Sequence, residues 1–238
     1  MNILIIGYGK MGKEIEQLAL NRNHNISKII DSENDWINFN NKNIDVAIEF
    51  STPQTVKENI LKCFRHNIPV VTGTTGWNDS LAEVENECKK QHCTLLYGPN
   101  FSIGMNIMFQ LNKYLFNFIK HFPEYSAEIE ETHNVHKIDK PSGTSVTLAN
   151  DIINNNPLYK NWSINENNAP QTLKIKVIRE GDAKGNHKVI CISENDKICI
   201  EHEAFSRKGF ATGAIIAAEW IKNKKGLYKF EDFFVESY

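Results

Sequence analysis

The stretch from Glu131 to Thr144 reads E-T-H-N-V-H-K-I-D-K-P-S-G-T and carries the side chains best suited to chemistry. Two histidines and two lysines fall within eight residues, followed by a Pro-Ser-Gly-Thr turn and an apolar-periodic run from Val146. Ser142 or Thr144 can cap a helix there, because a hydroxyl accepts a hydrogen bond from the unpaired amides of a first turn. Those amides, with the positive end of the helix dipole, favour an anion such as a carboxylate. The stretch therefore predicts a pocket that binds a small anion and gives it a proton.

Within this stretch, His133 and Lys137 are the candidate catalytic residues. An imidazole with an ordinary pKa of about 6.5 suits a general acid near neutral pH. The lysine brings fixed positive charge that can hold a carboxylate or stabilise negative charge in a reaction. The simpler alternative is a polar loop followed by an ordinary capped helix, and it suffices for any one of these residues taken alone.

The chain opens with a strand and a glycine-rich turn typical of dinucleotide binding. The continuous apolar run Asn2–Ile6 is typical of a strand buried on both faces of a parallel sheet. A G-x-G-x-x-G follows directly and leads into a helical pattern, the context in which this motif binds nucleotides. Its glycines allow a tight turn, close approach of the backbone to a pyrophosphate and close helix–strand packing. The predicted cofactor-binding residues of this turn are Gly7, Tyr8, Gly9, Lys10, Met11 and Gly12.

An acidic residue follows the second predicted strand, Ile26–Ile30, where the dinucleotide motif places a partner for the ribose hydroxyls. This residue, Asp31, would accept hydrogen bonds from a 2′-hydroxyl but repel a 2′-phosphate, and no Arg or Lys follows at the next two positions. An alternative is that Asp31 only caps the next loop. The sequence predicts NADH or NADPH as cofactor and favours NADH.

Composition bounds the class of protein. The 238 residues are 41% hydrophobic and 24% charged, as expected for a globular protein of one large or two modest domains. A net charge of −2 gives no electrostatic reason to expect nucleic acid or a membrane as partner. Five cysteines without a C-x-x-C pair argue for reduced thiols and against a disulfide frame or a zinc site. Because the early apolar run is too short for a signal peptide, we expect a cytoplasmic protein without a bound metal.

The rest of the pattern predicts two kinds of domain. Strands at Asp45–Phe50, Pro69–Val71 and Cys93–Tyr97 alternate with helices at Val56–Phe64 and Ser80–Gln91, which predicts an α/β fold with a Rossmann-type, doubly wound parallel sheet. Ligands of such sheets bind beyond the carboxyl ends of the strands, where the polar loops fall.

Beyond Ser102 the pattern predicts an α+β domain with an open mixed sheet, one face of which is free. Helices are expected at Gly104–Ile119 and about Ser145–Asn154, and the polar segment Asn155–Pro170 is read as a loop. Four isoleucines near the free face predict that another subunit covers it, and hence a homo-oligomer: Ile190, Ile192, Ile198 and Ile200. The expected strands are Ser126–Thr132, Leu173–Ile178, Lys188–Ser193 and Lys197–His202.

Several motifs resemble, in the same order, those of the 4-hydroxy-tetrahydrodipicolinate reductase (dihydrodipicolinate reductase) family. The run H-N-V-H-K-I-D-K-P-S-G-T from His133 resembles the family's H-H-x-x-K-x-D-x-P-S-G-T, with Asn134 in place of the second histidine. The runs T-G-T-T-G from Thr72, P-N-F-S from Pro99 and S-R-x-x-F-A-x-G-A-x-x-A-A-x-W from Ser206 also match. The resemblance thus spans essentially the whole chain.

The resemblance implies reduction, with loss of water, of a cyclic dicarboxylate imine in lysine and diaminopimelate biosynthesis. It implies a dinucleotide-binding domain of residues 1–102 and 207–238, a substrate-binding and oligomerisation domain of residues 103–206, and a homotetramer. His133 and Lys137 would be catalytic. The substrate would bind Asn134, His136, Gly143 and Thr144, the asparagine amide donating a hydrogen bond without the charge of a histidine. The cofactor would also contact Gly73, Thr74 and Thr75 beside the nicotinamide, and Gly98, Pro99, Asn100 and Phe101 near the hinge.

Two other classes of protein share part of these features. A different NAD-dependent oxidoreductase, acting on an amino or sugar acid, would share the N-terminal half but would not need the run from His133 to Thr144. A non-catalytic nucleotide-sensing module would keep the glycines and Asp31, but would have no reason to retain His133 and Lys137 beside an anion site. The combination of both halves therefore favours the reductase.

Overall fold

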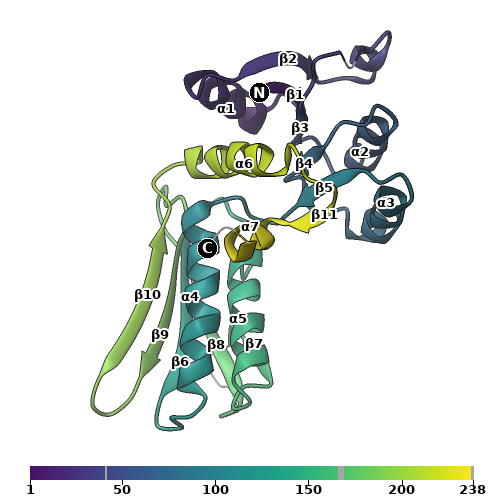
Figure 1. Cartoon of the computed structure of the whole chain (residues 1–238). Helices are drawn as coiled ribbons and strands as arrows, with labels where there is room; N and C mark the ends of the chain where they lie inside the picture. Colours follow the sequence, from purple (N-terminus) through teal and green to yellow (C-terminus); the bar gives the residue numbers. More distant parts are fainter. Residues whose placement is uncertain (41, 166–168, 237–238) are drawn as a thin grey trace. The chain divides into compact units, whose positions relative to one another are not determined.

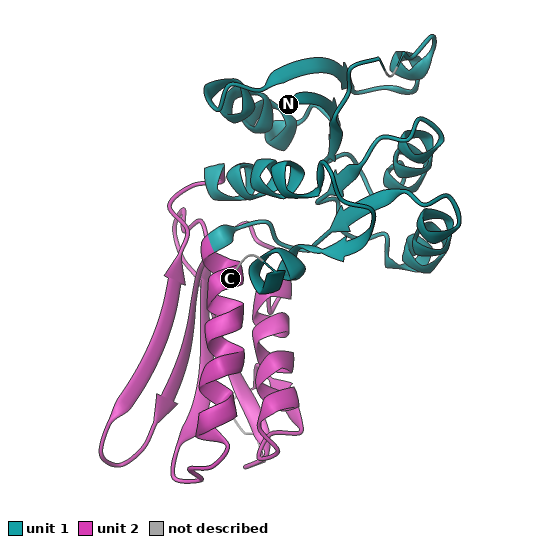
Figure 2. Cartoon of the chain, viewed as in Figure 1, with its two compact units in different colours: residues 1–103, 208–238 teal, residues 104–207 magenta. Residues whose placement is uncertain are grey.

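The computed structural model describes residues 1–40, 42–165 and 169–236, and the chain forms two compact units (Figure 2). Unit 1 comprises Met1–Ile103 and Lys208–Tyr238, and unit 2 comprises Gly104–Arg207. None of the described helices has the length and apolar character needed to cross a membrane.

Unit 1 is built on a six-stranded sheet in which every neighbouring pair of strands is parallel (Figure 1). The strand order β11-β5-β4-β3-β1-β2 places the first strand inside the sheet, as in doubly wound folds, and confirms the predicted Rossmann-type architecture. The strands are β1 (Asn2–Ile6), β2 (Asn25–Ile30), β3 (Val46–Glu49), β4 (Val70–Thr72), β5 (Thr94–Tyr97) and β11 (Gly226–Lys229).

Helices cover both faces of this sheet, which explains why an inner strand such as β1 is apolar on both sides. Successive side chains of β1 enter different cores: Ile3 and Ile5 join the cluster that includes α1 (Lys10–Asn21) and α6 (Lys208–Ile221). Leu4 and Ile6 join the cluster on the opposite face. That face is covered by α2 (Val56–Arg65) and α3 (Asn78–Lys90). Unit 1 also contains two short helices, η1 (Glu33–Trp36) and α7 (Phe230–Glu236).

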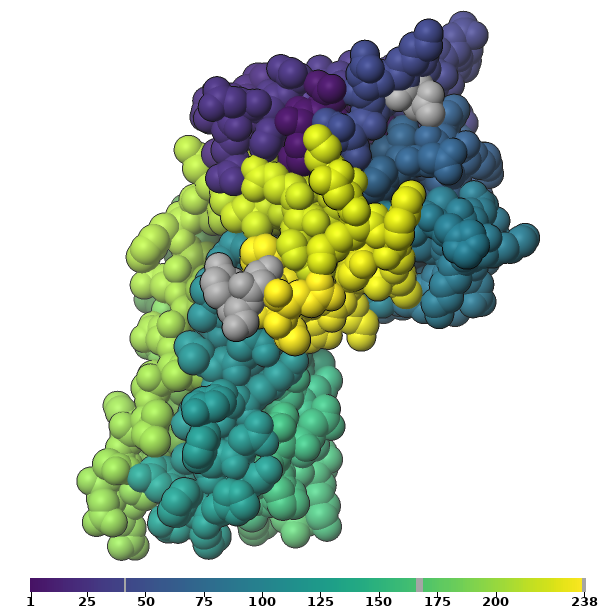
Figure 3. Space-filling view, in the orientation of Figure 1, coloured from purple at the N-terminus to yellow at the C-terminus, as the bar shows by residue number. Residues whose placement is uncertain are grey.

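The C-terminal segment completes unit 1, where Figure 3 shows it in yellow against the N-terminal elements. Strand β11 pairs with β5 at the edge of the sheet, and α6 supplies buried small residues to the core. One of these, Gly213, lies so close to the main chain that an added Cβ would come within 1.7 Å of the carbonyl oxygen of Phe101. Only glycine fits there without a shift of the helix.

Unit 2 contains a five-stranded mixed sheet with two helices side by side along one face (Figure 1). Strand β9 is antiparallel to both its neighbours, whereas β6–β8 and β7–β8 are parallel pairs, so the predicted mixed sheet is confirmed. The order is β10-β9-β6-β8-β7, with β6 (Ser126–His133), β7 (Asn161–Ser163), β8 (Thr172–Arg179), β9 (Asn186–Ile192) and β10 (Lys197–Glu203). The helices are α4 (Ile103–Ile119) and α5 (Gly143–Asn155).

The expected grouping of four isoleucines near one free face is wrong. In the β9–β10 register, Ile198 and Ile200 lie opposite Cys191 and Val189, which are fully buried beneath the helices. Ile190 and Ile192 alternate with those buried residues and so point to the other face. The free face therefore carries one pair of isoleucines, and the other pair borders α4.

Four other elements differ from the prediction or add to it. Strand β7 falls within the polar segment read as a loop, and residues 166–168 of that segment lie outside the described residues. Strand β11 and helix α7 divide the aromatic C-terminal segment. The sequence predicts a helix over Ala214–Lys222, and helix α6 begins earlier, at Lys208. The glycines before Ala214 lower helix propensity, but packing holds the first turns in the helix.

The close approach at Gly213 predicts a large loss of stability on adding one methyl group. Gly213→Ala should lower the free energy of unfolding by about 2–4 kcal/mol through overpacking against the Phe101 carbonyl. Gly209→Ala, in the same helix, has nothing within 4 Å of its added Cβ and should leave stability unchanged or slightly raised. Chemical denaturation of both variants measures the difference, and equal stabilities would contradict the packing argument.

Candidate active site

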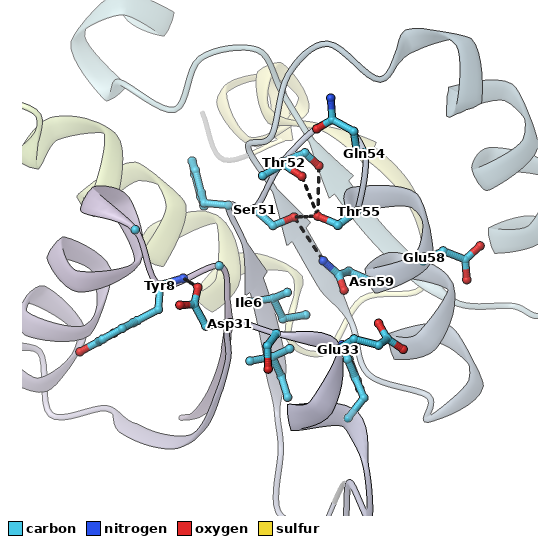
Figure 4. A pocket seen from close by; sticks show the side chains of 16 residues that line it. Ile6, Tyr8, Asp31, Glu33, Ser51, Thr52, Gln54, Thr55, Glu58 and Asn59 are labelled. Atoms are coloured by element: carbon cyan, nitrogen blue, oxygen red, sulfur yellow. Dashed lines mark hydrogen bonds between the residues drawn. The ribbon is translucent and has the colours of Figure 1, made fainter.

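A cleft of about 470 Å³ opens in unit 1 where the glycine-rich turn meets the ends of β2 and β3 (Figure 4). Gly7, Tyr8, Gly9 and Asp31 line it, so the structure brings these four predicted cofactor-binding residues together. The cleft is also lined by Ile6, Ile30, Ser32, Glu33, Trp36, Phe50, Ser51, Thr52, Gln54, Thr55, Glu58 and Asn59.

Two glycines of the turn are required by sterics. Gly7 has φ +86°, and a Cβ there would lie 2.3 Å from the carbonyl oxygen of Phe50. A Cβ on Gly12 would lie 2.2 Å from the carbonyl oxygen of Gly7. Gly9, the N-cap of α1, has open space around it and leaves the helix N-terminus accessible to a phosphate. The turn therefore fits the pyrophosphate of a dinucleotide.

Acidic side chains surround the part of the cleft expected to hold the adenosine ribose. Asp31 accepts a hydrogen bond from the Tyr8 amide through Oδ1 at 2.7 Å. Glu33 and Glu58 line the same cleft, and Glu33 is ion-paired with Lys62. The cleft thus carries three carboxylates, a poor environment for the additional negative charge of a 2′-phosphate.

The loop after β3 contributes groups to this cleft that sequence reasoning did not assign. Ser51 donates to the buried carboxylate of Glu49, and its hydroxyl accepts from Nδ2 of Asn59 at 3.2 Å. Thr72 donates to the other oxygen of Glu49 at 2.6 Å, so one buried acid fixes the ends of β3 and β4. The available signal was the acid within the otherwise apolar strand before Ser51.

The other predicted cofactor loops follow β4 and β5, and their residues do not line the cleft. Gly73 lies against the ring of Phe50, whereas Thr74 and Thr75 begin the loop that leads to α3. Gly98 is buried beside Phe230, and Pro99 and Asn100 continue the loop. Phe101 is buried in the core, so the loop can offer a ligand its main chain but not this ring. Lys10 and Met11, like Gly12, belong to the first turns of α1.

In unit 2, strand β6 directs two polar side chains into the interior. Because side chains alternate along a strand, Glu131 and His133 lie on the same face as the core residue Ile129. Glu131 is fully buried and His133 is 9% exposed. In a strand that alternates apolar and acidic residues, the acidic side chains ordinarily face solvent. Near the end of β6, Glu131 instead faces the interior.

The turn after this strand caps α5 as predicted, with Ser142 rather than Thr144 as the N-cap. The Ser142 hydroxyl accepts from the amide of Ser145 at 3.2 Å. Gly143 is exposed at the first helical position, and its amide has no partner among the described residues. The corner formed by Gly143 and Thr144 therefore keeps the anion-binding character of a helix N-terminus.

Glu131 lies directly behind this corner and ties it to the sheet. Oε2 accepts from the Ser142 amide at 2.8 Å and from the Ser145 hydroxyl at 2.6 Å. Oε1 is ion-paired with Nη2 of Arg179 at 2.9 Å. Burial would raise the pKa of Glu131, but the hydrogen bonds from Ser142 and Ser145 and the guanidinium hold it below its usual value. The carboxylate is thus ionised and accepts only.

His133 faces a second buried histidine, His187 of β9, which the sequence analysis did not place in the site. Their Nε2 atoms are 3.3 Å apart, and His187 Nε2 is also 3.2 Å from Oγ of Ser142. Burial, and then the neighbouring His133, lower the pKa of His187 to about 3. Burial is also the main reason that the pKa of His133 is lowered. Both rings are therefore neutral at neutral pH.

The loop between β6 and α5 holds the remaining predicted residues. Nζ of Lys137 is 2.8 Å from Oδ1 of Asp139, and Arg179 donates to the carbonyl oxygens of both residues, at 3.3 and 2.6 Å. Asn134 is turned into the loop, where its Oδ1 accepts from the amide of the exposed His136 at 3.1 Å. Arg179 thus orders the loop that carries Lys137.

Three potential metal ligands, Glu131, His133 and His187, have donor atoms within 4.8 Å of one another. The carboxylate, however, is already engaged at both oxygens, and one partner is the guanidinium of Arg179. A cation placed here would meet that fixed positive charge. These residues fit a hydrogen-bond network better than a metal centre.

Both halves of the chain match known proteins of one family. Residues 1–101 match the model of the dihydrodipicolinate reductase N-terminus, and residues 104–234 match that of its C-terminus. The 4-hydroxy-tetrahydrodipicolinate reductase of Christiangramia forsetii is 43% identical over 232 residues, covering 98% of this chain and 97% of the relative. That of Rickettsia bellii is 33% identical, covering 95% and 91%. A dipicolinate-bound dihydrodipicolinate reductase from Paenisporosarcina sp. TG-14 shares the fold, with TM-score 0.78, 22% identity and coverage of 98% and 99%. The chain belongs to the dihydrodipicolinate reductase family.

Proposed function

We propose that this protein is a 4-hydroxy-tetrahydrodipicolinate reductase that uses NADH or NADPH in lysine and diaminopimelate biosynthesis. It reduces a cyclic dicarboxylate imine to tetrahydrodipicolinate, with loss of water. The single observation that carries the proposal is family membership over both halves of the chain. The geometry supports the proposal, because a cleft beside the glycine-rich turn occupies unit 1, and a capped helix N-terminus with a histidine pair occupies unit 2.

The residues of unit 2 bind and polarise a doubly negative substrate. One carboxylate binds the amides of Gly143 and Thr144 at the N-terminus of α5. The ammonium of Lys137 holds the other carboxylate and stabilises negative charge on the ring. His133 presents a ring N–H beside them, and Asn134 and His136 complete the contacts from the loop. Binding would require Lys137 to exchange its ion pair with Asp139 for one with the substrate.

Unit 1 supplies the cofactor site. The bound nicotinamide cofactor supplies the hydride. The turn from Gly7 to Gly12, including Tyr8, Lys10 and Met11, would bind the pyrophosphate, and Asp31 would accept from the ribose hydroxyls. Gly73, Thr74 and Thr75, and the loop of Gly98, Pro99, Asn100 and Phe101, would contact the nicotinamide half. We assign residues 1–102 and 207–238 to dinucleotide binding and residues 103–206 to substrate binding and oligomerisation.

A coupled assay tests the activity directly. Pyruvate and aspartate semialdehyde, condensed by a separate synthase, supply the substrate, and the loss of nicotinamide absorbance reports turnover for each nucleotide in turn. Oxidation of the cofactor that depends on both precursors supports the proposal. A purified, folded enzyme that oxidises neither nucleotide would refute it.

Replacing Lys137 should remove most turnover while leaving the cofactor site intact. Lys137→Ala loses the charge that holds a substrate carboxylate, so kcat/KM should fall about a hundredfold or more, with the Kd for NADH unchanged. Lys140→Ala removes a lysine from the same loop at an exposed position and serves as the control. Equal turnover in the wild type and Lys137→Ala would remove this residue from the mechanism.

The three carboxylates of the cleft predict a preference for NADH over NADPH. Asp31→Asn keeps an oxygen that can accept from the Tyr8 amide but removes one negative charge. The ratio of kcat/KM for NADPH to that for NADH should rise at least about tenfold, equivalent to about 1.4 kcal/mol. Asp79→Asn removes the same charge outside the cleft and should leave the ratio unchanged. If the ratio stayed unchanged in Asp31→Asn as well, Asp31 would not determine the cofactor preference.

We also propose that the protein is cytoplasmic and assembles as a homotetramer. Exposed apolar side chains on α4 and β10 support assembly, since Tyr114, Phe118 and Ile198 are 66%, 53% and 37% exposed. Light scattering should then give about four times the mass of the 27.3 kDa chain. A mass equal to one chain at micromolar concentration would exclude the tetramer.

A further inference from the structure

A directed chain of hydrogen bonds begins at the carboxylate of Glu131. Because the ionised carboxylate can only accept, Ser145 donates its single hydroxyl hydrogen to Oε2 of Glu131, at 2.6 Å. Ser142 in turn donates to Oγ of Ser145, at 3.3 Å. With its hydrogen spent, the Ser142 hydroxyl can meet Nε2 of His187, 3.2 Å away, only as an acceptor. His187 must therefore carry its proton on Nε2.

The surroundings of His187 support the same tautomer independently. Its Nδ1 is buried and has no hydrogen-bond partner among the described residues. A proton on Nδ1 would be a buried, unpaired donor, whereas a proton on Nε2 has both Ser142 and His133 as acceptors. His187 also remains neutral, so it has one ring proton to place.

The proton on His187 fixes the state of His133. The two Nε2 atoms are 3.3 Å apart, and two N–H groups cannot face each other at that distance. Nε2 of His133 must therefore be the acceptor, which leaves the proton of neutral His133 on Nδ1. This nitrogen has no partner among the described residues and is not enclosed as Nδ1 of His187 is. Gly185 beside it has no side chain, and a Cβ there would lie 3.4 Å from Nδ1.

We propose that Glu131, acting through Ser145, Ser142 and His187, sets the tautomer of His133 so that the neutral ring presents Nδ1–H to a ligand. His133 then donates a hydrogen bond without giving up its proton, and the other four are positioning residues that act through it. The role in reduction rests on the proposed function, whereas the tautomer itself does not.

Nuclear magnetic resonance of the full-length enzyme labelled with [15N]histidine reads the tautomer directly. Spectra at pH 7.5 without ligand should show His133 protonated on Nδ1 and His187 protonated on Nε2. The missing signals of His133→Gln and His187→Gln assign the two rings, and His121→Gln, an exposed histidine of the same unit, should remove only its own signals. A proton on Nε2 of His133, or on both its nitrogens, would overturn the proposal. Because this measurement needs no turnover, it stands apart from failure of the proposed activity.

Two variants test the chain between Glu131 and His133. Glu131→Gln introduces an amide that can donate to Ser145, so the direction of the chain is lost and His133 should populate both tautomers. Turnover should fall about tenfold, with the Kd for NADH unchanged. Glu130→Gln is the matched control, because its carboxylate lies on the neighbouring position of β6 and pairs with Lys176 at the surface. If Glu131→Gln does not fold, Ser142→Ala interrupts the chain and keeps the buried charge. An unchanged His133 spectrum in the folded variant would refute the chain.

Discussion

The buried carboxylate of Glu131 is the constraint on which the candidate substrate site depends. Removing an ionised group from water costs several kcal/mol, so a buried carboxylate stays ionised only where hydrogen-bond donors or positive charges compensate it. Here the Ser142 amide and the Ser145 hydroxyl donate to one oxygen, and Arg179 is ion-paired with the other. These three partners come from the helix cap and from the neighbouring strand. One charge therefore fixes the start of α5, the end of β8 and the loop between β6 and α5.

Each of the two units uses a buried carboxylate to order polar segments near its candidate site. In unit 1 the buried Glu49 accepts from Ser51 after β3 and from Thr72 at the end of β4, and in unit 2 Glu131 accepts from the cap of α5. Each acid lies near the carboxyl end of its strand and orders polar loops that a hydrophobic core could not hold in place. Loops positioned by rigid elements are the usual carriers of ligand contacts.

Much of this arrangement could be predicted from the sequence because the signals were local. The continuous apolar run before Gly7, the glycine-rich turn and the capped helix at Ser142 each involve neighbouring residues, and the structure has these elements. The site network could not be predicted in the same way. Arg179 and His187 reach Glu131 and His133 from other strands, and only the pairing of β6 with β8 and β9 brings them together. The prediction for the four isoleucines failed for a related reason, since strand register decides which face of the sheet each side chain occupies.

The position of β11 in the chain affects how unit 1 folds during synthesis. The edge strand Gly226–Lys229 and the core helix α6 both follow the whole of unit 2 in the chain. Residues 1–103 are therefore synthesised before one strand and one covering helix of their unit, and part of their apolar sheet stays open to water. All of unit 2 is synthesised before that gap can close. Residues 1–103 thus pass through a stage in which exposed core must be protected from aggregation until α6 and β11 have been synthesised.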